Sequence, residues 1–361
     1  MTADAPYRFL AFDLSYFSAK VRPALRYKRL WYDEIPADPQ VVKQLTGMNF
    51  IPIIVTPEDD TWQDSTDIYA HLEVRHPEPR LFPTTPLQRV ASHLIELYVD
   101  DFALIPAMYT RWGTGERERY ARALFEGTFG AMGNLAADMM LSRKDSLGIE
   151  PANGPAIEAH IEDLLAALSK HFAEHRYLFG NRMSFADCAL MGPFYGHFYT
   201  DLISRKLLLD TALPVVRWIQ RCNFPNSTQH KDWFADDALP PSLLEVLTVM
   251  GLDAAPVLLD MLRAVERWAD ERPTDEAKVP RAIGITPTTL RGTEIKRAAL
   301  PYLLWAFQQV RDVYNGFRDG DRARVDDVLG GTGWEEVLAY TPRHRLRKEK
   351  FKLVFEADVS P

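Results

Sequence analysis

Three hydroxyl side chains lie close together in the stretch DLSYFSAKVRPAL (13–25), directly after the apolar run FLAF. They belong to Ser15, Tyr16 and Ser18. The apolar run is typical of a buried strand, and the residues after it have a helical pattern. A hydroxyl at such a junction can cap the helix, or it can donate a hydrogen bond to a bound anion. The residues by themselves leave both possibilities open for each of the three.

A second candidate is the stretch FIPIIV, in which Pro52 interrupts a β-branched run. Proline cannot donate to a sheet ladder, so it belongs at an edge or a bend, and the Ile51–Pro52 bond can be cis. Either arrangement leaves the backbone N–H and C=O of Ile51 available to a peptide-like ligand. An ordinary edge-strand proline is the alternative explanation.

A third candidate is the stretch WQDSTDI, which ends a short strand and starts a helix. Asp64 or Ser65 can cap that helix, whose free N–H groups form an anion site. An Asp-Ser pair at a helix end would suit a ligand that carries both an ammonium and a carboxylate. A plain helix cap explains the same residues.

The elements that position these residues alternate between strand and helix over about the first 80 residues. Strands are expected at 8–12, 30–35, 51–56 and 62–63, and helices at 19–30, 39–47 and 65–75. This order in so short a span predicts a small α/β domain with a mixed sheet. The segment HPEPRLFPTTP (76–86) contains four prolines and is expected to be a linker.

The remainder of the chain is expected to be mainly helical. Residues 87–218 show long amphipathic stretches without a convincing strand, and Ser184 and Asp187 match a capping box. A loop-rich stretch at 221–242 follows. Beyond it, helices are expected at 243–272 and 294–316, with a loop between them, and a strand where apolar residues alternate at 351–355.

Composition limits the class of protein. The chain has 361 residues, 47% of them hydrophobic, which is enough for one large core or two ordinary ones. The formal net charge of −8 argues against nonspecific binding to nucleic acid or to anionic membranes. Two cysteines, no signal-peptide pattern and no uncharged stretch of bilayer length predict a cytoplasmic protein without a membrane span. His171 and His175 have metal-ligand spacing, but no third ligand is evident, so no metal is expected.

Together, the three stretches resemble the thioredoxin-fold N-terminal domain of the cytosolic glutathione transferases. LSYFSAKVR resembles the family's first-strand loop, IP its cis-proline strand and DS its γ-glutamyl-binding pair, while LFGNRMSFADCAL is similar to the capping-box segment of its helical domain. The resemblance covers residues 7 to about 220. It implies an α+β fold with a thioredoxin-like glutathione-binding domain (1–80, mixed four-stranded sheet) and an all-α domain (87–225). Residues 240–361 lie beyond the family's usual end, and we expect them to be extra helices packed on the α domain.

The resemblance implies glutathione as co-substrate and a thiolate that attacks a small hydrophobic electrophile, by conjugation, ether cleavage or dehalogenation. Ser15 lies five residues before Lys20, where serine-type members carry the catalytic serine; Ser18 and Tyr16 are the alternatives. Lowering a thiol pKa from about 8.5 by roughly 2 units requires about 2.7 kcal/mol, which one charge-assisted hydrogen bond and a helix end can provide.

Other positions follow from the same resemblance. The glutathione-binding set is Ile51, Pro52, Asp64 and Ser65, with Lys43 and Gln44 as possible substitutes for a lysine that many members have where this chain has Phe50. The pocket for the hydrophobic co-substrate is expected to contain Tyr98, Asp101, Met108, Tyr109 and Trp112. Asp101 is expected to approach the glutamyl ammonium, and core packing explains the aromatic residues equally well.

The resemblance also implies a homodimer, formed through the linker and the first helix of the bundle, unless the extension covers that surface. A protein of another class fits the same residues. It is a non-catalytic scaffold or ligand-binding module of glutathione-transferase shape, whose extension binds a protein partner.

Overall fold

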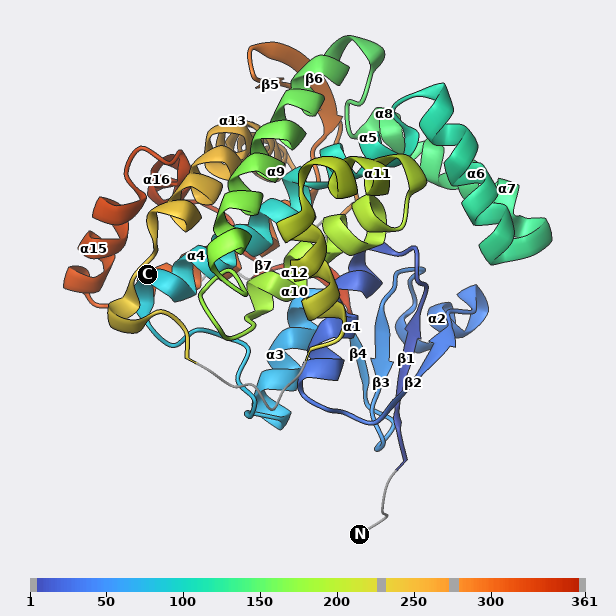
Figure 1. Ribbon diagram of the computed structural model, residues 1–361, viewed down its shortest axis with the longest axis horizontal. Helices are drawn as coiled ribbons and strands as arrows, with labels where there is room; N and C mark the ends of the chain where they lie inside the picture. The colour runs from blue at the N-terminus through green and yellow to red at the C-terminus, as the bar shows by residue number, and fades with distance from the viewer. Residues whose placement is uncertain (1–4, 226–231, 273–278, 357–361) are drawn as a thin grey trace.

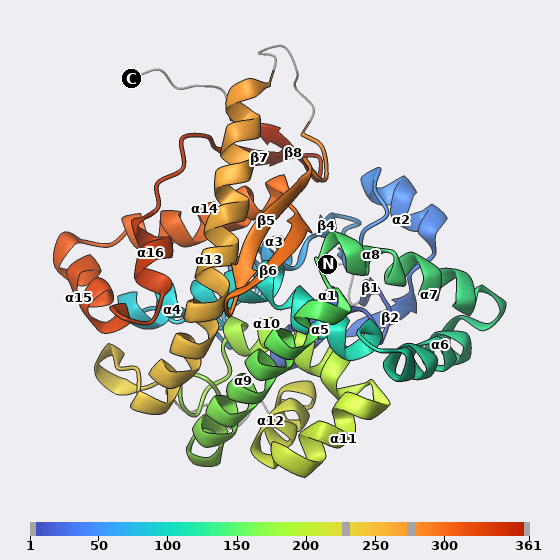
Figure 2. The same ribbon diagram turned by 90° about the horizontal axis from the view of Figure 1, so that it is seen from above.

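The computed structural model of the protein describes residues 5–225, 232–272 and 279–356. Figure 1 shows a small sheet with its flanking helices at one side of the molecule and a larger helical part beside it. The described N-terminus lies at the sheet side, and the C-terminal elements lie against the helices that follow the sheet domain (Figures 1 and 2).

The first domain is a four-stranded mixed sheet in the order β2-β1-β3-β4. β1 pairs in parallel with β2 and antiparallel with β3, which pairs antiparallel with β4. Its elements are β1 (Tyr7–Ala11), α1 (Tyr16–Tyr27), β2 (Tyr32–Pro36), α2 (Pro39–Thr46), β3 (Ile53–Val55), β4 (Thr61–Gln63) and α3 (Ser65–Arg75). This is the thioredoxin-like topology that the sequence predicts.

Alternate residues of β1 and β3 point to opposite faces of the sheet. A hydrophobic core lies on each of these faces. Phe9 and Ile54 belong to the main hydrophobic core, which includes residues of α1 and α3. Leu10 and Ile53 belong to a small separate core together with Val42 of α2. Because β1 and β3 are antiparallel, with Leu10 opposite Ile53, the turn after β1 and the start of β3 lie at the same end of the sheet.

The second part of the chain is helical, as expected. Its elements are α4 (Pro86–Leu97), the π-helix η1 (Tyr98–Phe102), α5 (Leu104–Trp112), α6 (Gly115–Phe129), α7 (Gly133–Leu141), α8 (Arg143–Ser146), α9 (Gly154–Glu174), α10 (Phe185–Pro193), the π-helix η4 (Phe194–Tyr199), α11 (Leu202–Thr211) and α12 (Leu213–Asn223), with short 3-10 turns at Gly130–Met132, Pro151–Asn153 and Ala235–Asp237. Ser184 and Asp187 form the capping box of α10, which confirms that prediction.

The first domain docks on the helical part where α1 crosses α10 and η4. A Cβ built at Gly192 would lie 3.0 Å from the Tyr16 ring, and one at Gly196 would lie 3.2 Å from the Tyr16 Cα. These distances are too short for most side chains, so the two glycines allow the helices to approach closely. The close approach fixes the start of α1, and with it the turn that carries Ser15.

The C-terminal extension is only partly the set of helices that the sequence suggests. Its elements are α13 (Pro241–Glu271), β5 (Ile285–Leu290), β6 (Thr293–Ala298), α14 (Pro301–Asn315), α15 (Asp319–Leu329), α16 (Trp334–Ala339), β7 (Leu346–Glu349) and β8 (Lys352–Phe355). The helix expected at 294–316 begins only at Pro301, because the residues before it form the second strand of the hairpin β5–β6. Arg291 and Gly292 both have positive φ, which suits a two-residue hairpin turn. The strand expected near the C-terminus is present as β8.

The long helix α13 is a core helix of this part of the molecule. By length and composition it could cross a membrane, but 67% of its most apolar window is buried inside the protein. It packs against α9, η1 and the hairpin β5–β6, and the hairpin lies alongside it in Figure 2. Burial of this kind is typical of the central helix of a globular core.

The extension covers the helix that was expected to form a dimer interface. α14 and α15 both pack on α4, the first helix of the bundle. Val90, Leu94 and Ile95 of α4 are fully buried within the single chain. A dimer formed through α4 would require the extension to move, so the expected interface is not available in this conformation. The oligomeric state itself stays a prediction.

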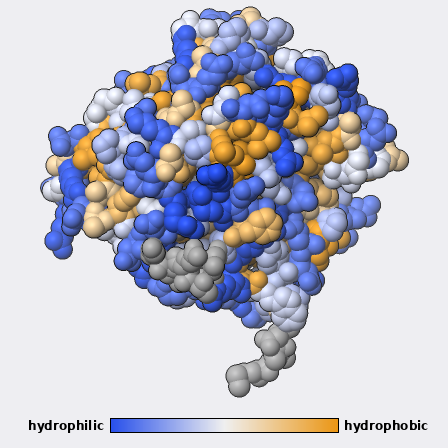
Figure 3. Space-filling model, viewed as in Figure 1, coloured by the Kyte–Doolittle hydropathy of each residue, from blue (hydrophilic) through white to orange (hydrophobic). Residues whose placement is uncertain are grey.

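The face of the molecule seen in Figure 3 mixes hydrophilic and hydrophobic residues, and hydrophobic residues gather near its centre. In Figure 1 this region is where α11 and α12 face the viewer. Leu202, Leu209 and Leu213 of these helices are exposed.

Candidate active site

Ser15 is the residue that caps α1. Its Oγ accepts a hydrogen bond from the backbone N–H of Ser18 at 3.2 Å, so the hydroxyl proton is left free to donate. The side chain is half-buried. The N–H groups of Tyr16 and Phe17 in the first turn make no hydrogen bond to another described residue, and the helix end adds positive partial charge. The turn can therefore stabilise an anion placed beside Ser15.

The other two hydroxyls of the turn are placed differently. The Tyr16 side chain is buried, and its hydroxyl donates to the carbonyl of Val99 at 2.7 Å. Burial raises the pKa of Tyr16 well above its usual value. Ser18 is fully buried, and its Oγ lies 3.5 Å from the backbone N of Phe12, from which it accepts. Of the three hydroxyls, that of Ser15 is the one with access to solvent.

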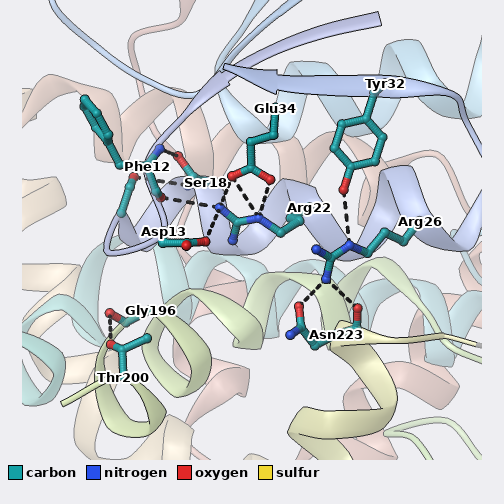
Figure 4. Close-up of polar contacts among 11 residues, drawn as sticks. Phe12, Asp13, Ser18, Arg22, Arg26, Tyr32, Glu34, Gly196, Thr200 and Asn223 are labelled. Carbon is teal, nitrogen blue, oxygen red and sulfur yellow. Dashed lines mark hydrogen bonds and ion pairs between the residues drawn. The ribbon is translucent and has the colours of Figure 1, made fainter. Parts of the chain in front are cut away.

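Two arginines hold the turn in place. Arg111 of α5 is buried and donates to the carbonyl of Leu14 at 3.2 Å and to both carboxylate oxygens of Asp201 at 3.0 Å. Arg22 of α1 donates to the carbonyl of Phe12 at 3.5 Å and pairs with Glu34 of β2 (Figure 4). The backbone on each side of Asp13 is thus fixed from both domains.

The Ile51–Pro52 peptide bond is cis, and it lies just before β3. Neither the N–H nor the C=O of Ile51 forms a hydrogen bond within the described part of the chain, and the residue is half-buried. The preceding carbonyl, that of Phe50, accepts from the Gln63 side-chain amide at 3.3 Å. The free groups of Ile51 can form a short ladder with an extended peptide.

Asp64 and Ser65 begin α3. Asp64 has a φ of 79°, which is rare for a residue other than glycine and often marks a functional site. Its carboxylate caps α3 by accepting from the N–H of Thr66 at 3.0 Å. The same carboxylate lies 3.2 Å from the ammonium of Lys348 in β7. The ammonium also pairs with Asp67 at 2.7 Å and lies 3.3 Å from the centre of the Trp305 ring.

Asp64 and Asp67, together called the Asp64 corner below, are therefore already partly neutralised by Lys348 of the extension. Tyr302 of α14 also reaches Asp64, and burial together with this carboxylate raises the pKa of Tyr302 well above its usual value. An ammonium group of a ligand would have to compete with Lys348 for Asp64. Ser65 is buried beside this pair.

A buried cluster of charges joins the corner to the helical domain. Lys20 of α1 is fully buried and pairs with Asp100 and, at 3.6 Å, with Glu96. The hydroxyl of Thr66 donates to Glu96 at 2.9 Å. Burial raises the pKa of Glu96 to about 7, although the Lys20 ammonium opposes that rise. The cluster links the α3 end of the site to α1.

The side chains expected to form the co-substrate pocket are buried in the core. Tyr98 bonds to His160 at 2.7 Å, and the Tyr109 hydroxyl donates to Glu158 at 2.8 Å. Met108 and Trp112 are also buried. A surface hollow of about 220 Å³ beside α5 is lined by other residues, namely Thr110, Arg117, Tyr120, Ala121, Leu124, Thr200, Asp201, Leu202 and Ile203.

Asp101 does not face the Asp64 corner. It forms a buried ion pair with Arg297 of β6 at 2.8 Å. The neighbouring Asp100 is the acid that accepts from Thr66, at 3.3 Å. Because η1 is a π-helix, simple helical spacing gives a poor guide to which of the two acids faces α3.

Sequence reasoning missed the contributions of the extension. Lys43 and Gln44 are exposed on α2, whereas Arg281 stacks on Phe50, with the guanidinium carbon 4.1 Å from the ring centre. No local pattern connects Lys348 or Arg281 with residues more than 200 positions earlier. The buried Lys20 was a detectable signal, since a lysine on the apolar face of an amphipathic helix requires a buried acid.

The family comparisons agree with this geometry. Residues 9–80 match the family model described as glutathione S-transferase, N-terminal domain, and residues 156–224 match that described as glutathione S-transferase, C-terminal domain. No curated protein matches the chain. The two matches follow the order of the two folded parts, and they identify a glutathione S-transferase N-terminal domain at residues 9–80 and a glutathione S-transferase C-terminal domain at residues 156–224.

Several solved structures are similar to this chain. A glutathione S-transferase from Rhodospirillum rubrum has 16% identity over 66% of this chain and 97% of its own, with a TM-score of 0.43. FzlA from C. crescentus has 18% identity over 66% and 98%, with a TM-score of 0.41. The β-etherase LigF from Sphingobium sp. has 17% identity over 62% and 97%, with a TM-score of 0.41.

Proposed function

We propose that this protein is a glutathione-dependent transferase in which the Ser15 hydroxyl stabilises the thiolate of bound glutathione. One observation carries the proposal. Ser15 uses its oxygen to cap α1 and keeps its proton free, at a half-buried position beside unpaired N–H groups of the first turn.

Glutathione would bind as an extended peptide. Its cysteinyl main chain pairs with the free N–H and C=O of Ile51, next to Pro52, and this places the sulfur near the turn after β1. Its γ-glutamyl end extends toward Asp64 and Ser65 at the start of α3. The match to the family's N-terminal domain supports this orientation, and so does the absence of any described hydrogen-bond partner for the Ile51 main chain.

The chemistry requires only that the thiol ionise near neutral pH. A hydrogen bond to a charged acceptor contributes about 1.5–3 kcal/mol, and a helix end contributes about 0.3–1 kcal/mol. Their sum corresponds to about 1–3 pKa units, since one unit equals about 1.36 kcal/mol. The thiolate then attacks an electrophilic carbon of a small hydrophobic molecule, and conjugation, ether cleavage and dehalogenation all begin with this step.

The test compares wild type with Ser15→Ala, using Ser18→Ala as the control because Ser18 lies in the same turn but is fully buried. Wild type should bind glutathione and show the ultraviolet absorbance of a thiolate at neutral pH. Ser15→Ala should retain binding, raise the pKa of the bound thiol and slow turnover of 1-chloro-2,4-dinitrobenzene about 10- to 100-fold. Equal thiol pKa values in wild type and Ser15→Ala would refute the role of Ser15.

A non-catalytic scaffold is the second candidate, and one observation favours it. Lys348 already occupies the acids of the Asp64 corner. If wild type fails to bind glutathione at millimolar concentration, the scaffold becomes the better explanation. A homodimer and a cytoplasmic location remain proposals drawn from the family.

A further inference from the structure

An arginine without an acidic partner among the described residues, Arg281, lies near the start of β3, and the charge of a second one, Arg143, acts on it. Arg281 lies between α13 and β5, and its guanidinium stacks on Phe50 with 4.1 Å between the guanidinium carbon and the ring centre. Arg143 begins α8. Neither side chain forms an ion pair or a hydrogen bond with any described residue. Both side chains are exposed to solvent.

The two guanidinium groups lie close enough to influence each other. Partial desolvation by the surrounding chain lowers the pKa of Arg281 although part of its side chain is exposed, and the positive charge of Arg143 lowers it further. Like charges held together repel, and most protein surfaces place acids between them. In a pair without such an acid, the repulsion between the two charges decreases when an anion binds between them. Guanidinium groups are well suited to this because their planar forks match a carboxylate.

The position of the pair suggests which anion it receives. Phe50 directly precedes Ile51, whose main-chain groups are free. One extended residue spans about 3.3–3.6 Å. A peptide that pairs with Ile51 through one residue therefore places the carboxylate of the following residue near the Phe50 side chain. The contact with the Phe50 ring holds Arg281 beside Ile51, and its guanidinium N–H groups, which have no acidic partner among the described residues, are available to an anion.

We infer that Arg281, assisted by Arg143, binds the C-terminal carboxylate of the peptide ligand that pairs with Ile51. The inference rests on the proposed function and deepens it. The extension then has a role in the site: it provides a cation where the first domain has only an aromatic ring. Lys43 and Gln44, which the sequence suggested for this role, lie on α2, outside this pair.

The experiment is calorimetric titration with two ligands that differ at one end. Reduced glutathione has a free glycyl carboxylate, and its glycyl monoethyl ester has the same peptide with that carboxylate blocked. The variants are Arg281→Gln and Arg143→Gln. The control is Arg119→Gln on α6, an arginine that stacks on Tyr120 in a similar way, with 5.0 Å between the guanidinium carbon and the ring centre, but belongs to another part of the surface. Melting curves establish that each variant is folded.

We expect Arg281→Gln to raise the Kd for glutathione about 10- to 100-fold, as for loss of one charge-assisted contact. The Kd for the glycyl monoethyl ester should change less than twofold. Arg143→Gln should have a smaller effect in the same direction, and Arg119→Gln none. The inference is overturned, and the proposed function stands, if wild type binds glutathione and Arg281→Gln binds it equally well. If wild type binds neither ligand, both are overturned.

Discussion

The contact between Lys348 and the Asp64 corner leads to a prediction that combines stability and ligand binding. The variant is Lys348→Met, which keeps an unbranched apolar chain against Trp305 and removes the charge. In the structure the ammonium lies 2.7 Å from Asp67 and 3.2 Å from Asp64. The variant therefore leaves two carboxylates close to each other without their shared cation.

The expected loss of stability follows from the burial of these groups. The Lys348 side chain is 15% exposed, and those of Asp64 and Asp67 are 19% and 34% exposed. Removing one partner of a fully buried pair costs about 3–5 kcal/mol, whereas exposed pairs contribute about 0.2–1 kcal/mol. The corner lies between these limits, so we expect Lys348→Met to lower the free energy of unfolding by about 2 kcal/mol.

The effect on glutathione should have the opposite sign. Once Lys348 is neutral, Asp64 is free to accept the ligand's ammonium, and a gain of about 1.4 kcal/mol would lower the Kd about tenfold. Urea unfolding and calorimetric titration measure the two effects. The matched control is Lys352→Met, on the same hairpin, since Lys352 is exposed and has no ion pair with a described residue.

The reasoning would be refuted if Lys348→Met weakened glutathione binding, because Lys348 would then hold the ligand and not compete with it. It would also be refuted if stability and affinity both matched those of Lys352→Met. Lys348→Arg should preserve most of the stability, since it keeps the charge.

Two further predictions concern the groups that support the site. Burial raises the pKa of Glu96 to about 7, compared with about 4.5 in the unfolded chain, so the folded protein binds this proton more tightly. The free energy of unfolding that comes from this group is therefore lost as the pH rises from about 4.5 to 7. The free energy of unfolding of Glu96→Gln, relative to that of wild type, should therefore rise by about 1–3 kcal/mol between pH 5 and pH 8, as measured by urea unfolding. The same difference between variant and wild type at both pH values would contradict this. Arg111→Ala should lower the free energy of unfolding by about 3–5 kcal/mol, because it leaves Asp201 buried without a partner. Arg111→Lys should retain more stability yet slow turnover, since one ammonium nitrogen cannot reproduce the fork that joins Asp201 through Nε and the Leu14 carbonyl through Nη1. Unchanged turnover would refute a positioning role.

The local features of this protein could be predicted from sequence because short-range chemistry specifies them. The strand-helix order of the first domain follows from apolar periodicity. The capping box at Ser184 and the start of α3 at Ser65 follow from local hydrogen bonding. The fold class and the family could be identified for the same reason, since they depend on motifs a few residues long.

The hairpin β5–β6 of the extension does have a local signal in the sequence. The sequence ITPTTLRGTEIKRA contains two β-branched runs separated by Arg-Gly, which is a hairpin signal. The apolar face of α14 begins only at Leu300, and Pro301 marks the start of the helix, so the residues from Glu294 to Ala298 do not belong to it.

Other features were decided only by tertiary structure. The sequence alone indicates three hydroxyls near the end of β1. Docking of η1 against α1 decides that Tyr16 donates to Val99, and this leaves Ser15 as the accessible hydroxyl. Likewise, Lys348 reaches Asp64 and Arg281 reaches Phe50 because the chain returns across the first domain after more than 200 residues. Contacts of that separation depend on how whole helices pack, and no pattern within a short window of sequence contains that information.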